Sequence, residues 1–175
     1  MIPVSFFGFS NSGKTAVISE VVAILSERGF RVGVIKHSDK KIEMDIEGKD
    51  SWRIFRSGAD VLVLSPVKMA FQAHTGEMSL HELSDYFRDY DVVIAEGFKK
   101  DFLKGVAVVR DEAELIELLR VSKKNDILLV VYTGDEGIED FRKKCRLILS
   151  HAEVVSSSDV EKISDFVLRF SGIKV

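Results

Sequence analysis

The most chemically informative stretch of the chain is residues 8–15, which read GFSNSGKT and fit the pattern G-x-x-x-x-G-K-[ST]. In such a loop the backbone amides wrap a chain of phosphates, the lysine brings positive charge to the β- and γ-phosphates, and the final hydroxyl can hold Mg²⁺. An apolar run precedes the motif and a helical pattern follows it, so a helix N-terminus would face the same anion. The motif predicts a site for the phosphates of a purine nucleotide. We expect its contacts to come from Gly8, Ser10, Asn11, Ser12, Gly13, Lys14, Thr15 and Ala16, with Lys14 also catalytic and Thr15 also a metal ligand.

A second candidate site follows the apolar run at residues 91–95, where Glu96 and Gly97 end the run. Ligands of open α/β sheets bind at the carboxyl ends of the strands, so Glu96 is placed to hold a Mg²⁺-bound water or to orient an attacking water. Gly97 would allow the loop to approach the phosphates, and Lys99 is a further candidate beside them. The alternative is that Glu96 is an ordinary solvated loop acid. The presence of a phosphate-binding motif in the same chain favours a functional role for Glu96.

Charged residues also follow the next predicted strand, where Lys36 and His37 come first and Asp45, Lys49 and Asp50 lie a few residues later. This density of acids and lysines could couple metal and phosphate to a mobile switch, with Asp50 as a further metal ligand. The alternative is a solvated charged loop that leads into a helix.

Two further stretches carry weaker signals. Lys40, Lys41 and Glu43 have the character of plain surface. Residues 133–135, which read TGD, end a predicted strand where they could touch the base or ribose, and an ordinary turn explains them equally well.

Strand and helix patterns alternate along the chain, and the elements that they predict would position these residues. Buried-strand patterns cover residues 2–7, 30–36, 91–95, 105–109 and 127–132, and helical patterns cover residues 14–28, 49–57, 79–89, 111–119 and a C-terminal stretch opened by a capping box at residues 158–161. Two β runs at 60–64 and 68–73 flank Pro66 and predict a hairpin. Alternation of this kind predicts an α/β fold, the three-layer arrangement of P-loop NTPases, with a mostly parallel sheet, helices on both faces and an added β-hairpin. We expect a single nucleotide-binding domain over residues 1–175.

Composition excludes several classes of protein. The net charge is −3 with 30% charged residues, so we expect neither a nucleic-acid-binding face nor a membrane anchor. The single cysteine excludes a disulfide framework, which suits a reducing cytoplasm.

The order and spacing of these motifs resemble one family, molybdopterin-guanine dinucleotide biosynthesis protein B (MobB). The resemblance runs from Pro3 to about Arg110 and more loosely to the C-terminus. The matching pieces are the loop at 8–15, IKH at 35–37, D-x-x-G-K-D-S at 45–51, SGA at 57–59 and EGFK at 96–99.

The resemblance implies a P-loop NTPase that binds GTP, hydrolyses it slowly with Mg²⁺ and forms a homodimer. It also implies a role in assisting a MobA-type nucleotidyltransferase, which attaches GMP to molybdopterin. The family usually has further histidines after the pair that matches Lys36 and His37, whereas this chain has SDKK at 38–41. Of the histidines that the resemblance would associate with the molybdenum cofactor, this chain therefore keeps His37 alone at this point.

Other functions remain open from the residues alone. A P-loop small-molecule kinase would need a cationic lid, and the stretch after Glu96 offers lysines but only one arginine, Arg110. An ATP-dependent accessory NTPase and a nucleotide-gated binding module without useful turnover would use the same residues as a GTPase. A Ras-like GTPase is disfavoured because the chain has no Asn-Lys-x-Asp segment.

Overall fold

The protein is described by a computed structural model over residues 2–38, 42, 44–98, 104–135 and 137–174. Within these residues the chain forms two compact units. The first contains Met1–His37 and Leu80–Val175, and the second contains Ser38–Ser79.

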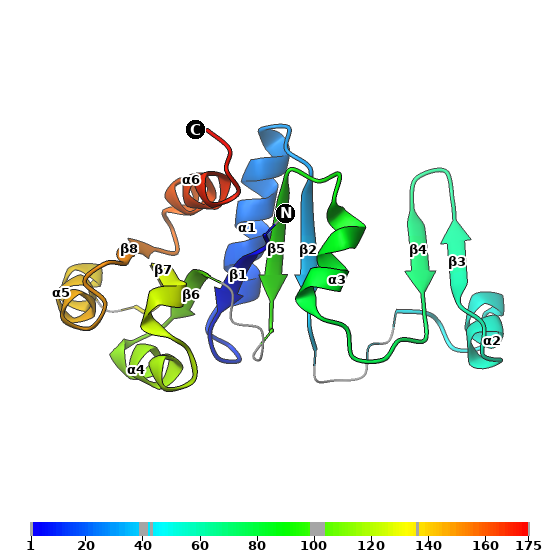
Figure 1. Cartoon of the computed structure of the whole chain (residues 1–175), viewed down its shortest axis with the longest axis horizontal. Helices are drawn as coiled ribbons and strands as arrows, with labels where there is room; N and C mark the ends of the chain where they lie inside the picture. The colour runs from blue at the N-terminus through cyan, green and yellow to red at the C-terminus, as the bar shows by residue number, and fades with distance from the viewer. Residues whose placement is uncertain (1, 39–41, 43, 99–103, 136, 175) are drawn as a thin grey trace. The chain divides into compact units, whose positions relative to one another are not determined.

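A six-stranded parallel sheet forms the centre of the first unit, in the order β2-β5-β1-β6-β7-β8 (Figure 1). Its strands are β1 (Val4–Phe7), β2 (Val32–Lys36), β5 (Val92–Glu96), β6 (Gly105–Val109), β7 (Ile127–Tyr132) and β8 (Glu153–Ser156). Strands β1, β5 and β6 are buried along their whole length, as parallel strands covered on both faces must be. The predicted α/β fold is therefore confirmed.

Helices cover both faces of this sheet. They are α1 (Lys14–Glu27), α3 (Leu80–Ser84), α4 (Glu112–Val121), α5 (Ile138–Ile148) and α6 (Val160–Phe170), with short 3₁₀ turns η1 (Asp85–Phe87) and η2 (Lys124–Asp126). Helices α1 and α6 pack on one face, where Val21 and Val167 join Phe6 and Ile94 in one buried cluster. Helices α4 and α5 pack on the other face through Leu115 and Phe141. Alternate residues of β5, such as Val93, point to that second face, where they meet α3.

The order in which strands are added to the sheet reverses beside β1. Strands β2 and β5 lie on one side of β1, and the later strands β6, β7 and β8 lie on the other. The helix after β1 covers one face, whereas the helix after the neighbouring strand β6 covers the other. This is a topological switch point, and ligands of open α/β sheets bind beside such points at the carboxyl ends of the strands. The phosphate-binding motif at residues 8–15 lies there, between β1 and α1.

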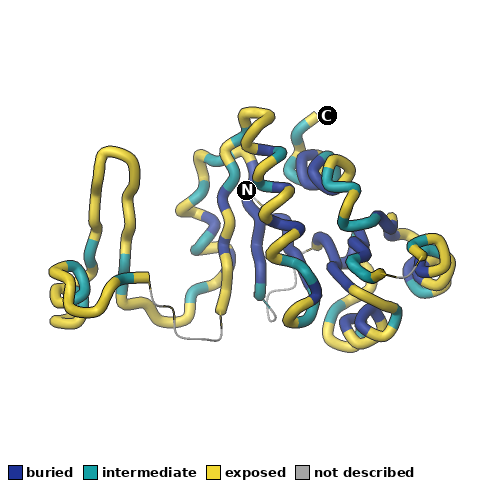
Figure 2. Tube along the Cα trace, turned by 180° about the vertical axis from the view of Figure 1, so that it is seen from behind, coloured by how far each residue is buried: buried dark blue, intermediate teal, exposed yellow. Residues whose placement is uncertain are grey.

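The second unit consists of α2 (Asp50–Arg56) and an antiparallel hairpin of β3 (Val61–Leu64) and β4 (Met69–Gln72). The hairpin confirms the prediction made from the runs around Pro66. Its side chains are largely exposed, whereas the strands of the large sheet are mainly buried (Figure 2). A stack of Phe55 on His74, with ring centroids 4.0 Å apart, joins the helix to the end of the hairpin.

The C-terminal third contains elements that the sequence analysis did not predict, namely α5 and β8. The predicted capping box at residues 158–161 is wrong. Helix α6 begins at Val160 with Asp159 as its N-cap, while the hydroxyl of Ser158 bonds to that of Ser156 at 2.8 Å and Glu161 pairs with Arg28.

The expectation of a single nucleotide-binding domain stays a prediction, although every strand of the large sheet belongs to the first unit. None of the helices in the described residues combines the length with the apolar character that crossing a bilayer requires.

Candidate functional site

The phosphate-binding motif forms a tight loop whose glycines are required by the backbone. Gly8 has a φ of 149°, and a Cβ there would lie 2.4 Å from the carbonyl oxygen of Val108. Gly13 has a φ of 87° and caps α1, and no described side chain caps this helix end. An anion bound at this end of α1 would meet the positive end of the helix dipole.

The lysine of the motif lies folded over its own loop. Lys14 Nζ donates to the carbonyl of Phe9 at 2.6 Å and to Ser12 Oγ at 3.4 Å. The side chain of Ser12 is buried, whereas Ser10 and Asn11 at the tip of the loop are exposed. The ammonium thus lies over the concave backbone that the motif predicts for phosphates.

Three side chains from three different elements meet beside the loop. The Thr15 hydroxyl donates to Glu96 Oε1 at 2.9 Å, and Lys36 Nζ donates to Thr15 Oγ1 at 3.1 Å. The same ammonium pairs with both carboxylate oxygens of Glu96, at 3.2 and 3.1 Å. The register of the sheet explains the meeting, because Lys36 lies opposite Glu96 at the carboxyl ends of β2 and β5.

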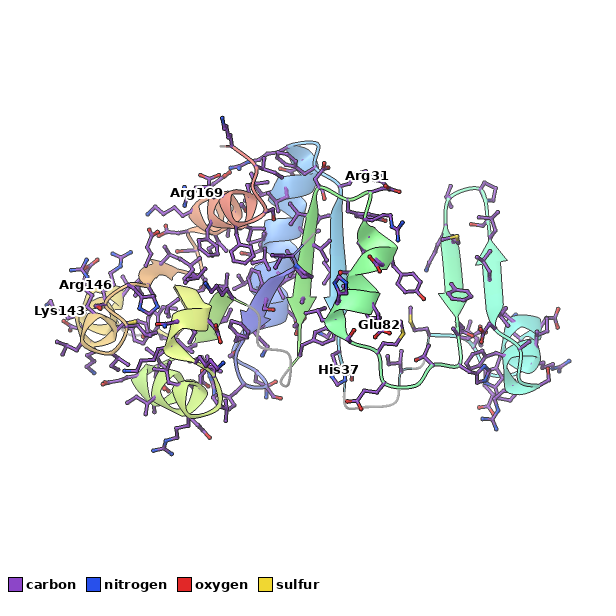
Figure 3. The ribbon with its side chains drawn as sticks, viewed as in Figure 1. Arg31, His37, Glu82, Lys143, Arg146 and Arg169 are labelled. Carbon is purple, nitrogen blue, oxygen red and sulfur yellow. The ribbon has the colours of Figure 1, made fainter. Side chains whose placement is uncertain are left out.

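Gly97 and Phe98, the two residues directly after β5, lie against the end of β2. Gly97 has a φ of 89°, and a Cβ there would lie 2.5 Å from the carbonyl oxygen of His37. His37 donates its backbone N–H to the carbonyl of Glu96 at 2.8 Å, and its ring lies against that of Phe98. His37 lies at the carboxyl end of β2 (Figure 3). The absence of a Cβ on Gly97 therefore allows the two segments to lie close together at the carboxyl edge of the sheet.

The end of β7 also contacts the phosphate-binding loop. Thr133 Oγ1 donates to the carbonyl of Ser12 at 2.9 Å, and its methyl carbon would be 3.2 Å from a Cβ on Gly13. The sequence analysis considered residues 133–135 either as a base or ribose contact or as an ordinary turn. In the structure the Thr133 hydroxyl bonds to the backbone of the loop at residues 8–15. The signal that could have indicated this contact is the position of Thr133 directly after a buried strand.

The residues present fit a magnesium ion. Mg²⁺ takes oxygen ligands and is usually bound by one or two protein groups, with waters and phosphate oxygens completing its shell. Thr15 and Glu96 supply a hydroxyl and a carboxylate that already lie within hydrogen-bond distance of each other. No cluster of three or more His, Cys, Asp or Glu side chains that could hold a metal ion occurs among the described residues. The set therefore fits an ion that shares its shell with a nucleotide rather than an all-protein metal centre.

The remaining predicted site residues are Asp45, Lys49, Asp50, Lys99 and Ala16. Asp45, Lys49 and Asp50 belong to the second unit, where Lys49 is the N-cap of α2 and Asp50 its first residue. Their proposed roles with metal and phosphate stay predictions. Lys99 lies outside the described residues, and Ala16 lies exposed in the first turn of α1.

The chain is similar to proteins of one family along most of its length. Residues 3–133 match the family described as Molybdopterin guanine dinucleotide synthesis protein B. The Molybdopterin-guanine dinucleotide biosynthesis adapter protein of Escherichia coli is 32% identical over 160 residues, covering 81% of this chain and 91% of the relative. The adapter protein of Haemophilus influenzae is 36% identical over 109 residues, covering 60% of this chain and 61% of the relative. The match to the Haemophilus protein thus spans about three fifths of that protein's length.

Solved structures show the same similarity. A crystal structure of molybdopterin-guanine biosynthesis protein B aligns with a TM-score of 0.73 and 34% identity, covering 98% of this chain and 99% of the other. The structure of Bacillus subtilis MobB aligns with a TM-score of 0.72 at 24% identity, which supports the fold alone.

Proposed function

The chain belongs to the family of Molybdopterin guanine dinucleotide synthesis protein B, and from that membership we propose that it is a GTP-binding adapter in molybdopterin guanine dinucleotide biosynthesis. We further propose that it hydrolyses GTP slowly with Mg²⁺. The observation that carries the proposal is the meeting of Thr15 with Glu96 at 2.9 Å beside the loop at residues 8–15. A phosphate-binding loop, a metal-binding hydroxyl and an acid at one strand end are the parts that nucleotide hydrolysis requires.

Each part has a distinct task in this proposal. The loop amides and the N-terminus of α1 bind the phosphates, and Lys14 leaves the Phe9 carbonyl to contact the β- and γ-phosphates. Thr15 and Glu96 would hold Mg²⁺, which neutralises the charge that develops on the phosphates. Glu96 also orients the attacking water, because its carboxylate is fixed by the Thr15 hydroxyl.

Two partners follow from the adapter role. We propose that the protein acts on molybdopterin or its molybdenum form together with a MobA-type nucleotidyltransferase.

We also propose a homodimer, for which the hairpin supplies a surface. Leu62 pairs with Phe71 and Leu64 with Met69 across the strands, and all four side chains are more than half exposed. An exposed apolar hairpin face with unpaired edges favours association with a second chain.

A nucleotide titration tests the proposal. Fluorescent GTP and ATP analogues are titrated with Mg²⁺ into the wild type, Lys14→Ala and Lys123→Ala, which alters an exposed lysine outside the candidate site. We expect tighter binding of GTP than of ATP, loss in Lys14→Ala only, and slow release of phosphate from GTP. Tighter binding of ATP would favour a small-molecule kinase or an ATP-dependent NTPase. Binding without turnover would indicate a nucleotide-gated module.

A further inference from the structure

One lysine contacts both residues that are suited to hold the metal. Lys36 Nζ lies 3.1 Å from the Thr15 hydroxyl and 3.1–3.2 Å from the two carboxylate oxygens of Glu96. These are the same oxygens that a Mg²⁺ ion would take. The ammonium and the ion carry charge of the same sign and seek the same oxygen donors, so both cannot hold them fully at once.

Burial decides which partner of this pair can move. Glu96 is only 7% exposed, and a carboxylate that is this buried needs a compensating positive charge. The side chain of Lys36 is 52% exposed and sits on a flexible four-carbon stem. The ammonium can therefore move into water when another cation replaces it, whereas Glu96 stays in place. The backbone bond from His37 to the carbonyl of Glu96 also fixes the two strand ends to each other.

We propose that Lys36 is a tethered counter-ion that competes with Mg²⁺ for Thr15 and Glu96, and that it thereby sets how strongly nucleotide binding depends on metal. The inference rests on the proposed function, because it assumes that nucleotide and Mg²⁺ bind at this loop. With Lys36 in place, the charge of Glu96 is neutralised and phosphates can approach without metal. Without Lys36, Glu96 repels the phosphates until a metal ion arrives.

The test compares GTP affinity in Mg²⁺ with GTP affinity in EDTA. The variants are Lys36→Met, Lys36→Gln, which keeps a hydrogen-bond donor toward Glu96 but carries no charge, and Lys36→Arg, which keeps the charge. Lys123→Met controls for the loss of an unrelated surface lysine. We expect the ratio of dissociation constants, EDTA over Mg²⁺, to rise about tenfold in Lys36→Met and Lys36→Gln, the size of one charge-assisted contact. Lys36→Arg and Lys123→Met should keep the wild-type ratio, and the Mg²⁺ concentration for half-maximal effect should fall in the two neutral variants.

A double variant separates this role from a structural one. Glu96→Gln removes the charge for which the two cations compete, so adding Lys36→Met to Glu96→Gln should leave the ratio unchanged. Equal weakening of GTP binding with and without metal in Lys36→Met would make Lys36 a phosphate ligand and overturn the inference. An unchanged ratio in both neutral variants would overturn it as well. Failure of the wild type to bind GTP in either condition would overturn the proposed function itself, and that outcome is visible without any variant.

Discussion

Thr133 donates its hydroxyl to the carbonyl of Ser12 across 2.9 Å, and so ties the end of β7 to the phosphate-binding loop. The two residues are 121 positions apart in the chain. The same hydroxyl lies 3.2 Å from the carbonyl of Val109 at the end of β6. One side chain thus links the loop to two strand ends, which fixes the backbone that we propose wraps the phosphates. Thr133 is a positioning residue, because it contacts the loop rather than the phosphates themselves.

Replacing Thr133 by valine should weaken nucleotide binding about fivefold, because a lost neutral hydrogen bond costs about 1 kcal/mol. Valine keeps the size of the side chain but leaves the Ser12 carbonyl without this donor. Thr133→Ser keeps the hydroxyl and should bind nearly as the wild type does. Titration of a fluorescent nucleotide into both variants measures the effect. Equal affinity of the valine and serine variants would show that the loop holds its shape without this bond.

Gly97→Ala should destabilise the protein by about 1–3 kcal/mol more than Gly29→Ala does, which is the usual cost of forced overpacking. The two glycines have nearly the same φ, 89° and 88°, so the strain of a left-handed alanine is matched. A Cβ on Gly97 meets the carbonyl of His37 at 2.5 Å, whereas nothing lies within 4 Å of one on Gly29. Urea unfolding of the two variants measures the difference. Equal midpoints would mean that the loop after β5 moves away from β2 without cost.

Cys145 should be nearly inert to thiol reagents in the folded protein. Burial raises the pKa of this thiol from 9.0 to about 11, so the reactive thiolate is scarce at pH 8. Labelling of the native protein should be at least about a hundredfold slower than labelling in guanidinium, since burial also blocks access. Comparable rates would indicate frequent opening of α5.

The same pKa shift gives stability a pH dependence. A pKa that is higher in the folded state favours folding fully below pH 9.0, and this contribution is lost as the pH rises toward about 11. Cys145→Ala removes the titrating group. Its free energy of unfolding should therefore decline less than that of the wild type over this interval, as urea titrations at each pH would measure. Parallel declines would contradict the assignment to Cys145.

Leu64→Asp should convert the proposed homodimer to a monomer. Leu64 is 73% exposed on the apolar face of the hairpin, so the change adds charge to that face without opening a buried core. Light scattering should give a mass near 19.6 kDa for this variant and about twice that for the wild type. Val67→Asp, in the hairpin turn and 94% exposed, is the matched control and should stay dimeric. A wild-type mass of one chain at micromolar concentration would contradict the homodimer.

Local patterns predicted the fold as far as β7, because strands such as β5 and β6 are nearly continuous apolar runs and helix α1 repeats an apolar face. The pattern weakens beyond β7. Strand β8 has four residues, of which two are buried, and α5 buries only Phe141 and Cys145 among many charges. Strand β8 takes its place through its parallel pairing with β7. No pattern within β8 itself indicates that pairing.

The candidate site was likewise predictable from the sequence only in part. The loop at residues 8–15 and the position of Glu96 at a strand end follow from sequence, since both depend on neighbours in the chain. The pairing of Lys36 with Glu96 depends on β2 lying beside β5 in one particular register, across 60 positions. Sequence spacing alone therefore placed Lys36 near the ligand edge without indicating that it contacts Glu96.

Lys14 and Glu96 should divide the work of binding and hydrolysis. Lys14 meets the phosphates before and during the reaction, so Lys14→Ala should weaken nucleotide binding about tenfold to a hundredfold or more, since a charge-assisted contact is worth roughly 1.5–3 kcal/mol. Glu96 acts on metal or water, and Glu96→Gln keeps its size while removing its charge. Binding in saturating Mg²⁺ should then survive while hydrolysis falls, which is the signature of an interaction that strengthens in the transition state. Direct titration and single-turnover hydrolysis on both variants decide the matter, with Lys123→Ala as the control. If Glu96→Gln greatly weakens binding while turnover per bound nucleotide stays normal, the pair of Glu96 with the half-exposed Lys36 is structural and catalysis lies elsewhere.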